Sequence, residues 1–137
     1  LHDALPISER NVPMSRPSLP AVPSGPFRGS RVVSMRPIPS GMIERAVEIS
    51  AEYPEMHGAP IHVGDPAEIG IADLDRPEYG DPPVAREGDV PVFWECGVTP
   101  QEALLAARIP FAITHSPGMM FVSDAPHARW RVPGGRP

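Results

Sequence analysis

The segment that decides the fold reads Val92-Phe-Trp-Glu-Cys-Gly-Val-Thr-Pro-Gln101. Residues 90–94 are apolar and aromatic, which predicts a strand. Thr99-Pro-Gln-Glu102 has the pattern of a capping box with proline at the first helical position, and it predicts a helix through about residue 107. Cys96 and Gly97 therefore lie where a strand passes into a helix N-terminus, the basic unit of a mixed α/β domain.

Working outward, further short strands are predicted by apolar, β-branched runs. They cover residues 31–35, 60–63, 111–114 and 120–122, and Pro37 and Pro39 are expected to end the first of them. The chain has 21 prolines among 137 residues, about three times ordinary usage, which favours short elements.

Helices are predicted between these strands. Residues 41–52 have an apolar face, with Ser40 as the expected N-cap, and Asp65 is the expected N-cap of a short helical turn that follows it. Residues 72–89 are rich in acidic residues, Pro and Gly and predict a long surface loop. The predicted fold class is therefore α/β (mixed α+β), with short strands alternating with short helices and Pro-rich loops.

The chain ends differ in composition from the rest. Residues 1–8 are interpreted as an adaptor-like artefact, because Leu1 to Ile7 matches the translation of a common sequencing adaptor. Residues 9–30 are predicted to be an extended connector rich in Pro, Ser and Gly. Residues 125–137 lack apolar periodicity and predict a disordered tail. A lobe over residues 31–124 remains.

Charge and cysteine content exclude several classes of partner. The net charge is −5 and no run of basic residues is present, which argues against nucleic acid. No apolar stretch has the length of a membrane span. A single cysteine cannot form an internal disulfide, so a cytoplasmic location is expected.

The strand-to-helix turn is the strongest candidate for chemistry. A helix N-terminus stabilises a thiolate at Cys96 or a bound carboxylate, and Gly97 lets a ligand approach the backbone. The helix N-terminus at Thr99 offers N–H groups to an oxyanion. The alternative for Cys96 is a buried structural cysteine.

Histidines and one arginine supply the other candidates. His115 follows the predicted strand 111–114, where ligands gather in α/β folds, and its alternative is a turn histidine bonded to backbone. Arg36 follows the predicted strand 31–35 and suits a carboxylate, and its alternative is a surface ion pair. His57, His62 and Asp65 have only a loose metal-ligand spacing, so we expect them to line the site or support the fold, without a metal.

Several phrases, in the right order over residues 9–124, resemble the D-glutamate cyclase family of bacterial enzymes. Arg10-Asn-Val-Pro-Met14 is similar to the middle of the family's chain. The others are Val32-Val-Ser-Met-Arg-Pro-Ile-Pro39, His57-Gly-Ala-Pro-Ile-His-Val-Gly-Asp-Pro66, Gly70-Ile-Ala-Asp-Leu74, the opening segment 92–101 and Phe111-Ala-Ile-Thr-His-Ser-Pro-Gly118.

The resemblance implies a hydro-lyase that interconverts D-glutamate with 5-oxo-D-proline and water, without a cofactor. It also implies that residues 31–124 are the C-terminal lobe of a two-lobed protein. The active cleft would then lie between the lobes, and this piece alone would be inactive and prone to self-association. Met119 stands where the family usually has histidine. The alternatives are a hydro-lyase for another hydroxy or amino acid, and a non-catalytic carboxylate-binding module.

A mechanistic hypothesis follows from the resemblance. Arg36 would hold a substrate carboxylate and the helix N-terminus after Thr99 would hold the oxyanion. His115 would act as the acid and base, and Cys96 as a nucleophile or a polar wall.

Overall fold

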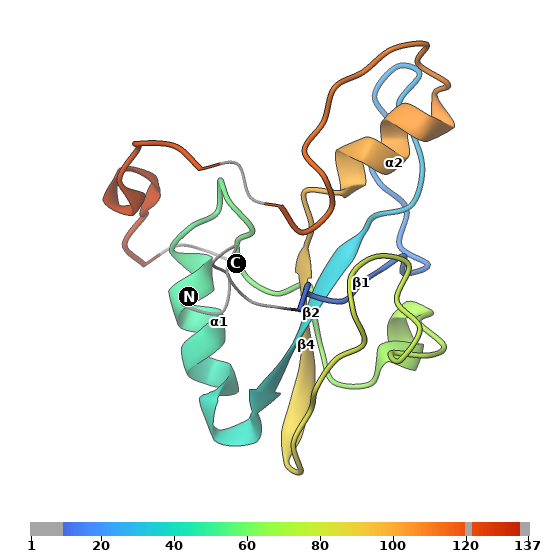
Figure 1. The fold of residues 1–137 in the computed structure, drawn as a ribbon. Helices are drawn as coiled ribbons and strands as arrows, with labels where there is room; N and C mark the ends of the chain where they lie inside the picture. Colours follow the sequence, from blue (N-terminus) through green and yellow to red (C-terminus); the bar gives the residue numbers. More distant parts are fainter. Residues whose placement is uncertain (1–9, 120–121, 135–137) are drawn as a thin grey trace.

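The computed structural model of the chain describes residues 10–119 and 122–134 (Figure 1). Its centre is a four-stranded antiparallel sheet in the order β1-β2-β4-β3, which confirms the mixed α/β class. The strands are β1 Met14–Ser15, β2 Val33–Pro39, β3 His62–Val63 and β4 Asp89–Glu95. The helices are α1 Ile43–Ala51 and α2 Thr99–Ala106, with the short 3-10 turns η2 Ser40–Met42, η3 Pro66–Ile69 and η4 His127–Trp130.

The long ladder between β2 and β4 organises the sheet, and it contains three prolines. The expectation that Pro37 ends the first strand is wrong, since Pro37 lies opposite Pro91 inside the ladder. The expectation is confirmed for Pro39, which is the last residue of β2. The carbonyl of Pro91 accepts the N–H of Gly64, on the side of β3. In an antiparallel pair, every second pair of opposed residues makes no hydrogen bond across the ladder. Two prolines at such a pair remove no ladder bond.

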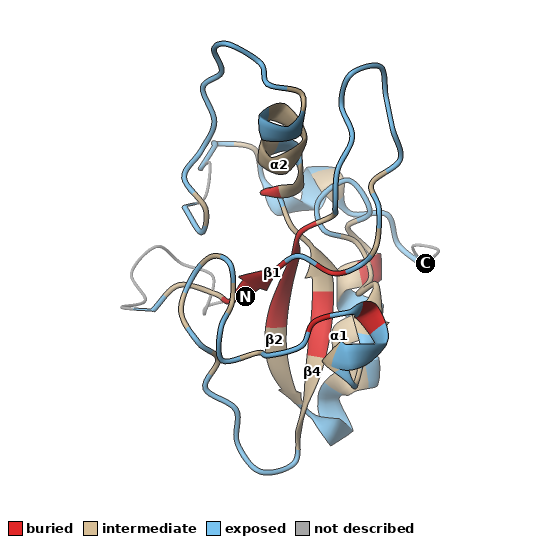
Figure 2. Cartoon of the chain, turned by 90° about the vertical axis from the view of Figure 1, so that its right-hand side faces the viewer, coloured by how far each residue is buried: buried red, intermediate tan, exposed pale blue. Residues whose placement is uncertain are grey.

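The two faces of the sheet carry separate clusters of buried side chains. On one face, Val33, Met35 and Phe93 pack with Ile69 and Ile71. On the other face, Met14, Val32 and Val98 pack together, with Cys96 against them. Figure 2 shows the buried residues of β1, β2 and β4 in the middle of the sheet, with mostly exposed loops around them. Burial therefore fixes which strand residues face which side.

The predicted connector contributes to the sheet. Within residues 9–30, Met14–Ser15 forms β1 and pairs with β2, and Met14 is 1% exposed. The predicted tail also makes contacts. Arg131 Nε lies 2.7 Å from Glu52 Oε2, and the Val132 N–H donates to the Glu52 carbonyl. Arg131 and Val132 thus contact Glu52, the C-cap residue of α1.

The predicted helix starts have different outcomes. Asp65 is confirmed as an N-cap, because its Oδ1 accepts the Ala67 N–H at 2.9 Å. Ser40 is not the N-cap of α1, since it lies in η2 and makes no side-chain capping bond. The loop prediction holds for residues 72–88, which form neither helix nor extended strand. Tyr79 in this loop makes an isolated bridge to Met14, and Leu74 packs against the core cluster of the sheet.

The predicted strand 111–114 is wrong for this chain: these residues are irregular and exposed. Of the predicted strand 120–122, residues 120 and 121 lie outside the described residues, as do Leu1 to Ile7. Among the described residues, no helix is long and apolar enough to cross a membrane.

Candidate active site

The register of β2 and β4 places Cys96 and Arg36 on the same face of the sheet. Arg36 lies opposite Val92, and the Cys96 N–H donates to the Val32 carbonyl at 2.9 Å, which extends the pairing by one residue. Opposed residues share a face, and residues two apart along a strand share it as well. Ser34 and Trp94 form the opposed pair that lies between Cys96 and Arg36.

The environment of the Cys96 sulfur favours the neutral thiol. Burial raises the pKa of Cys96 above its ordinary value, and the charge of Glu95 adds a smaller rise. A hydrogen bond from the Val98 backbone and the positive charge of Arg36 act in the opposite direction, and burial outweighs them. In this chain Cys96 is therefore a half-buried thiol within the electrostatic reach of Arg36.

The start of α2 is fixed by a contact that the capping-box prediction missed. The Thr99 hydroxyl accepts the Val32 N–H at 2.8 Å and lies 3.2 Å from the Val32 carbonyl. Val98, not Thr99, occupies the N-cap position, and no side chain caps the helix. The hydroxyl of Thr99 therefore joins α2 to β2, while the first N–H groups of the helix donate to the carbonyls of Cys96 and Val98.

Glu102, the other half of the expected capping box, also has partners elsewhere. It accepts a hydrogen bond from the Tyr79 hydroxyl and lies 3.5 Å from Arg16. This hydrogen bond is the main cause that raises the pKa of Tyr79. Glu102 thus ties the first turn of α2 to the long loop and to the segment after β1.

His115 lies beside the strand-to-helix turn, and a side chain of α2 holds it there. Gln101 Nε2 donates to the His115 carbonyl at 2.8 Å and lies 3.5 Å from Nδ1 of the ring. A Cβ on Gly97 would be 3.4 Å from Cε1 of the same ring. Gln101 was not singled out from the sequence, although its place in the first turn of the helix was a usable signal.

Met119 lies a few residues beyond His115, in the same loop. It is 58% exposed, and its N–H donates to the Ser116 carbonyl in a turn. The residue that replaces the expected histidine is therefore open to solvent in this chain.

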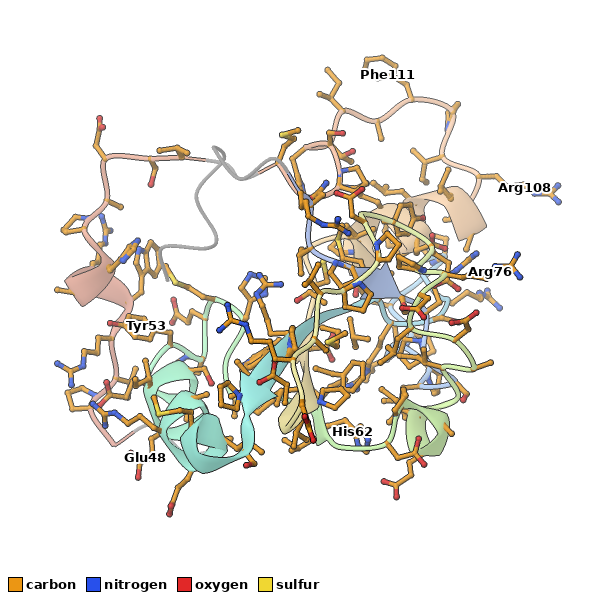
Figure 3. All side chains as sticks on the ribbon, turned by 60° about the horizontal axis from the view of Figure 1, so that its bottom comes forward. Glu48, Tyr53, His62, Arg76, Arg108 and Phe111 are labelled. Atoms are coloured by element: carbon orange, nitrogen blue, oxygen red, sulfur yellow. The ribbon has the colours of Figure 1, made fainter. Side chains whose placement is uncertain are left out.

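His57 and His62 lie in different surroundings. His57 Nδ1 lies 2.6 Å from the Glu95 carbonyl, next to Cys96. His62 lies opposite Phe93 on the other face, with ring centroids 5.6 Å apart, and its Nε2 is 2.8 Å from the Asp65 carbonyl (Figure 3). His62 and Asp65 therefore support the hydrophobic core and η3, away from the face that carries Cys96.

The candidate residues lie on an open surface, which could form one wall of a cleft. Surface hollows of about 340 and 360 Å³ lie beside α1 and beside the Arg16 segment, and neither is lined by Cys96 or His115. In the described part of the chain, no group of three or more His, Cys, Asp or Glu could hold a metal ion. Cys96, Gly97, His115 and Gln101 gather at the N-terminus of α2, with Arg36 on the same sheet face and His57 at its edge.

The fold is thus a mixed α/β domain whose strand-to-helix turn carries polar groups on an open surface. The sequence comparison identifies its family. The pattern of the D-glutamate cyclase family matches residues 4–124, and the chain belongs to that family.

Curated relatives are considerably longer than this chain. A Paracidovorax citrulli protein named "Putative hydro-lyase" is 55% identical over 122 residues, which are 89% of this chain and 45% of the relative. A Jannaschia protein of the same name is 59% identical over 114 residues, covering 83% and 43%. One from Arthrobacter is 50% identical over 126 residues, covering 92% and 47%. The chain thus spans a little under half the length of these relatives.

Proposed function

We propose that this chain is one lobe of a hydro-lyase that interconverts D-glutamate with 5-oxo-D-proline and water. The family and the names of the relatives support the reaction class. The observation that carries the site assignment is the meeting of Cys96, Gly97 and His115 at the N-terminus of α2. The second wall of the cleft would come from the part of the protein that this chain does not span.

Ring closure places definite demands on such a site. The α-amine nitrogen attacks the γ-carboxyl carbon, a carbon–nitrogen bond forms, and a carbon–oxygen bond breaks as the oxygen leaves as water. The amine loses protons and the leaving oxygen gains them. The enzyme must therefore orient a dianionic substrate, stabilise a tetrahedral oxyanion and transfer protons.

The residues of this wall match those demands. Arg36 supplies a guanidinium on the face that carries Cys96, suited to a substrate carboxylate. The N-terminus of α2 would act on the oxyanion through the positive end of the helix dipole, because the N–H groups of Thr99, Gln101 and Glu102 already donate to backbone carbonyls. His115 is exposed and held by Gln101, and it would carry protons between the amine and the leaving oxygen.

Of the two roles proposed for Cys96, nucleophile and polar wall, its surroundings support the second. Because burial raises the pKa of Cys96, the thiol keeps its proton and can donate a hydrogen bond at the reacting centre. Gly97 leaves room for the substrate next to the His115 ring, and His57 borders the same turn.

The test is kinetic and uses a full-length enzyme that contains this lobe. Cys96→Ala and His115→Ala are each expected to lower kcat/KM at least about tenfold, equivalent to about 1.4 kcal/mol of transition-state stabilisation. His127→Ala is the matched control, because His127 is exposed in η4 and lies outside the family match. Unchanged kinetics in both site variants would refute the site assignment.

The product distinguishes the reactions. Incubation with D-glutamate should yield 5-oxo-D-proline, identified by mass spectrometry and chiral chromatography against the authentic compound. A dehydrated product from another hydroxy or amino acid would instead support a related hydro-lyase. Saturable binding without turnover would support a carboxylate-binding module. The isolated 137-residue chain is expected to show no turnover, because an oxyanion site needs donors positioned around the substrate.

A further inference from the structure

Residues 111–114 have the sequence of a strand but pair with no strand among the residues that the structure describes. Phe, Ile and Thr favour strands, and Phe111 and Ile113 alternate with the smaller Ala112 and the polar Thr114. Among the described residues, no backbone hydrogen bond involves residues 110–114. Their backbone is therefore open to pairing with another chain segment.

The side chains of this segment give it an apolar face. Phe111 is 78% exposed and Ile113 is 86% exposed, and residues two apart lie on the same side of an extended chain. Figure 3 shows Phe111 at the edge of the molecule, directed away from the rest of the chain. Leu105 on α2 is also 70% exposed. Large apolar side chains exposed on one side of a segment are typical of an interaction site.

Both ends of the segment are held. At the C-terminus of α2, the Arg108 N–H donates to the Leu105 carbonyl and the Ile109 N–H to the Leu104 carbonyl, the two bonds of a Schellman motif. At the other end, Gln101 holds the His115 carbonyl. The segment is thus presented in a fixed place by α2, and it ends at a residue of the candidate site.

We propose that Phe111–Thr114 pairs as an edge strand with the half of the full-length protein that this chain does not contain. The matched relatives carry more than half of their length outside the region covered by this chain, so the full-length protein has the material for a partner strand. Pairing there would bury Phe111 and Ile113 and fix His115 against the second wall of the cleft. The inference rests on the proposed two-lobed enzyme and is independent of its substrate.

The test uses a full-length chimera, in which this chain replaces the matching region of the Paracidovorax citrulli relative. Amide hydrogen exchange is measured in the chimera and in the isolated chain. In the chimera, alternate amides in residues 111–114 are expected to exchange at least about tenfold more slowly than in the isolated chain, because an edge strand bonds its partner through every second residue. In the isolated chain they are expected to exchange without protection at any protein concentration.

A charge on the apolar face supplies the second measurement. Ile113→Asp is expected to abolish the protection in the chimera and to lower its melting temperature. Val84→Asp is the matched control, since Val84 is also β-branched and 67% exposed, but lies in the long loop. It should leave both quantities unchanged.

Two results would overturn the proposal. One is rapid exchange throughout residues 111–114 in a folded chimera. The other is protection in the isolated chain that rises with its concentration, which would identify a second copy as the partner. A protected chimera that does not convert D-glutamate would refute the proposed reaction and leave the interface standing. A chimera that converts D-glutamate while the amides of residues 111–114 exchange rapidly would support the proposed reaction and refute the interface.

Discussion

The imidazole of His115 lies against the backbone of Gly97, so close that a Cβ at position 97 would sit 3.4 Å from Cε1 and 3.6 Å from Nε2. Gly97 follows Cys96, at the turn where β4 gives way to α2. The space that glycine leaves open is therefore next to a thiol and an imidazole, where the proposed substrate would have to lie.

Gly97→Ala is expected to separate folding from catalysis. A contact of 3.4 Å is ordinary, and Gly97 does not have a positive φ, so alanine fits and should leave stability unchanged or raise it by up to about 1 kcal/mol. In the full-length enzyme, kcat/KM should nevertheless fall at least about tenfold, because the methyl group occupies substrate space. Thermal melting and steady-state kinetics measure the two effects. Gly41→Ala is the control, with open space around it and no positive φ, and equal kinetics in both variants would contradict the role of Gly97.

Thr99→Val is expected to destabilise the chain by about 1–3 kcal/mol. The buried Val32 N–H would lose its acceptor, and an unsatisfied buried donor carries about this cost. Thr99→Ser keeps the hydroxyl and should lose much less. Urea denaturation of the three proteins provides the measurement, and equal destabilisation by valine and serine would show that the methyl group of threonine matters more than its hydroxyl.

Tyr79→Phe tests the bond between the long loop and α2, and its effect should depend on pH. The hydrogen bond to Glu102, followed by burial and the charge of Glu102, raises the pKa of Tyr79 in the folded chain. The stabilisation is therefore fully present below the ordinary tyrosine pKa and is lost as the pH rises through the folded pKa. At neutral pH the substitution should cost about 1–2 kcal/mol.

The stability of both proteins at alkaline pH supplies the control for this experiment. Above the ordinary tyrosine pKa, wild-type stability should approach that of Tyr79→Phe. Burial raises the pKa of Cys96 as well, so both proteins should share a loss of stability that begins near the ordinary thiol pKa. Denaturant midpoints measured across this pH range would contradict the assignment if the gap between the two proteins stayed constant.

Arg108→Gly is expected to stabilise the chain. Arg108 has a φ of 52°, in the left-handed region, and it occupies the position after the α2 C-cap where glycine is preferred. A residue with a side chain loses about 1–2 kcal/mol in this conformation, so glycine should recover about 1 kcal/mol after its greater entropy in the unfolded chain is counted. Arg108→Ala keeps the strain and serves as the control. A lower melting temperature for the glycine variant than for the alanine variant would contradict this account.

His62→Ala is expected to affect folding and not turnover. His62 packs on Phe93 and bonds the Asp65 carbonyl, on the sheet face opposite Cys96. The loss of these contacts should cost about 1–2 kcal/mol of stability, while kcat/KM of the full-length enzyme stays near wild type. A large kinetic loss without a change in melting temperature would return His62 to the active site.

The sequence alone was sufficient for several elements whose interactions are local. An apolar run predicted β4, a proline and polar residues predicted the start of α2, and Asp65 was recognised as a cap because its partner, Ala67, is two residues away. Propensity, periodicity and capping depend on neighbours within a few residues, so they leave a readable pattern. The family could also be recognised from the sequence, because its motifs occur in this chain in the same order.

The tertiary structure decided what depends on distant partners. The Thr99 hydroxyl does not cap α2, because it bonds to the backbone of Val32, 67 residues away. Pro37 lies inside a strand because Pro91 lies opposite it. His62 and Cys96 lie on opposite faces of the sheet. The sequence alone does not show which face a histidine near a strand occupies. Such pairings are chosen by burial and register across the whole fold, and no local pattern records them.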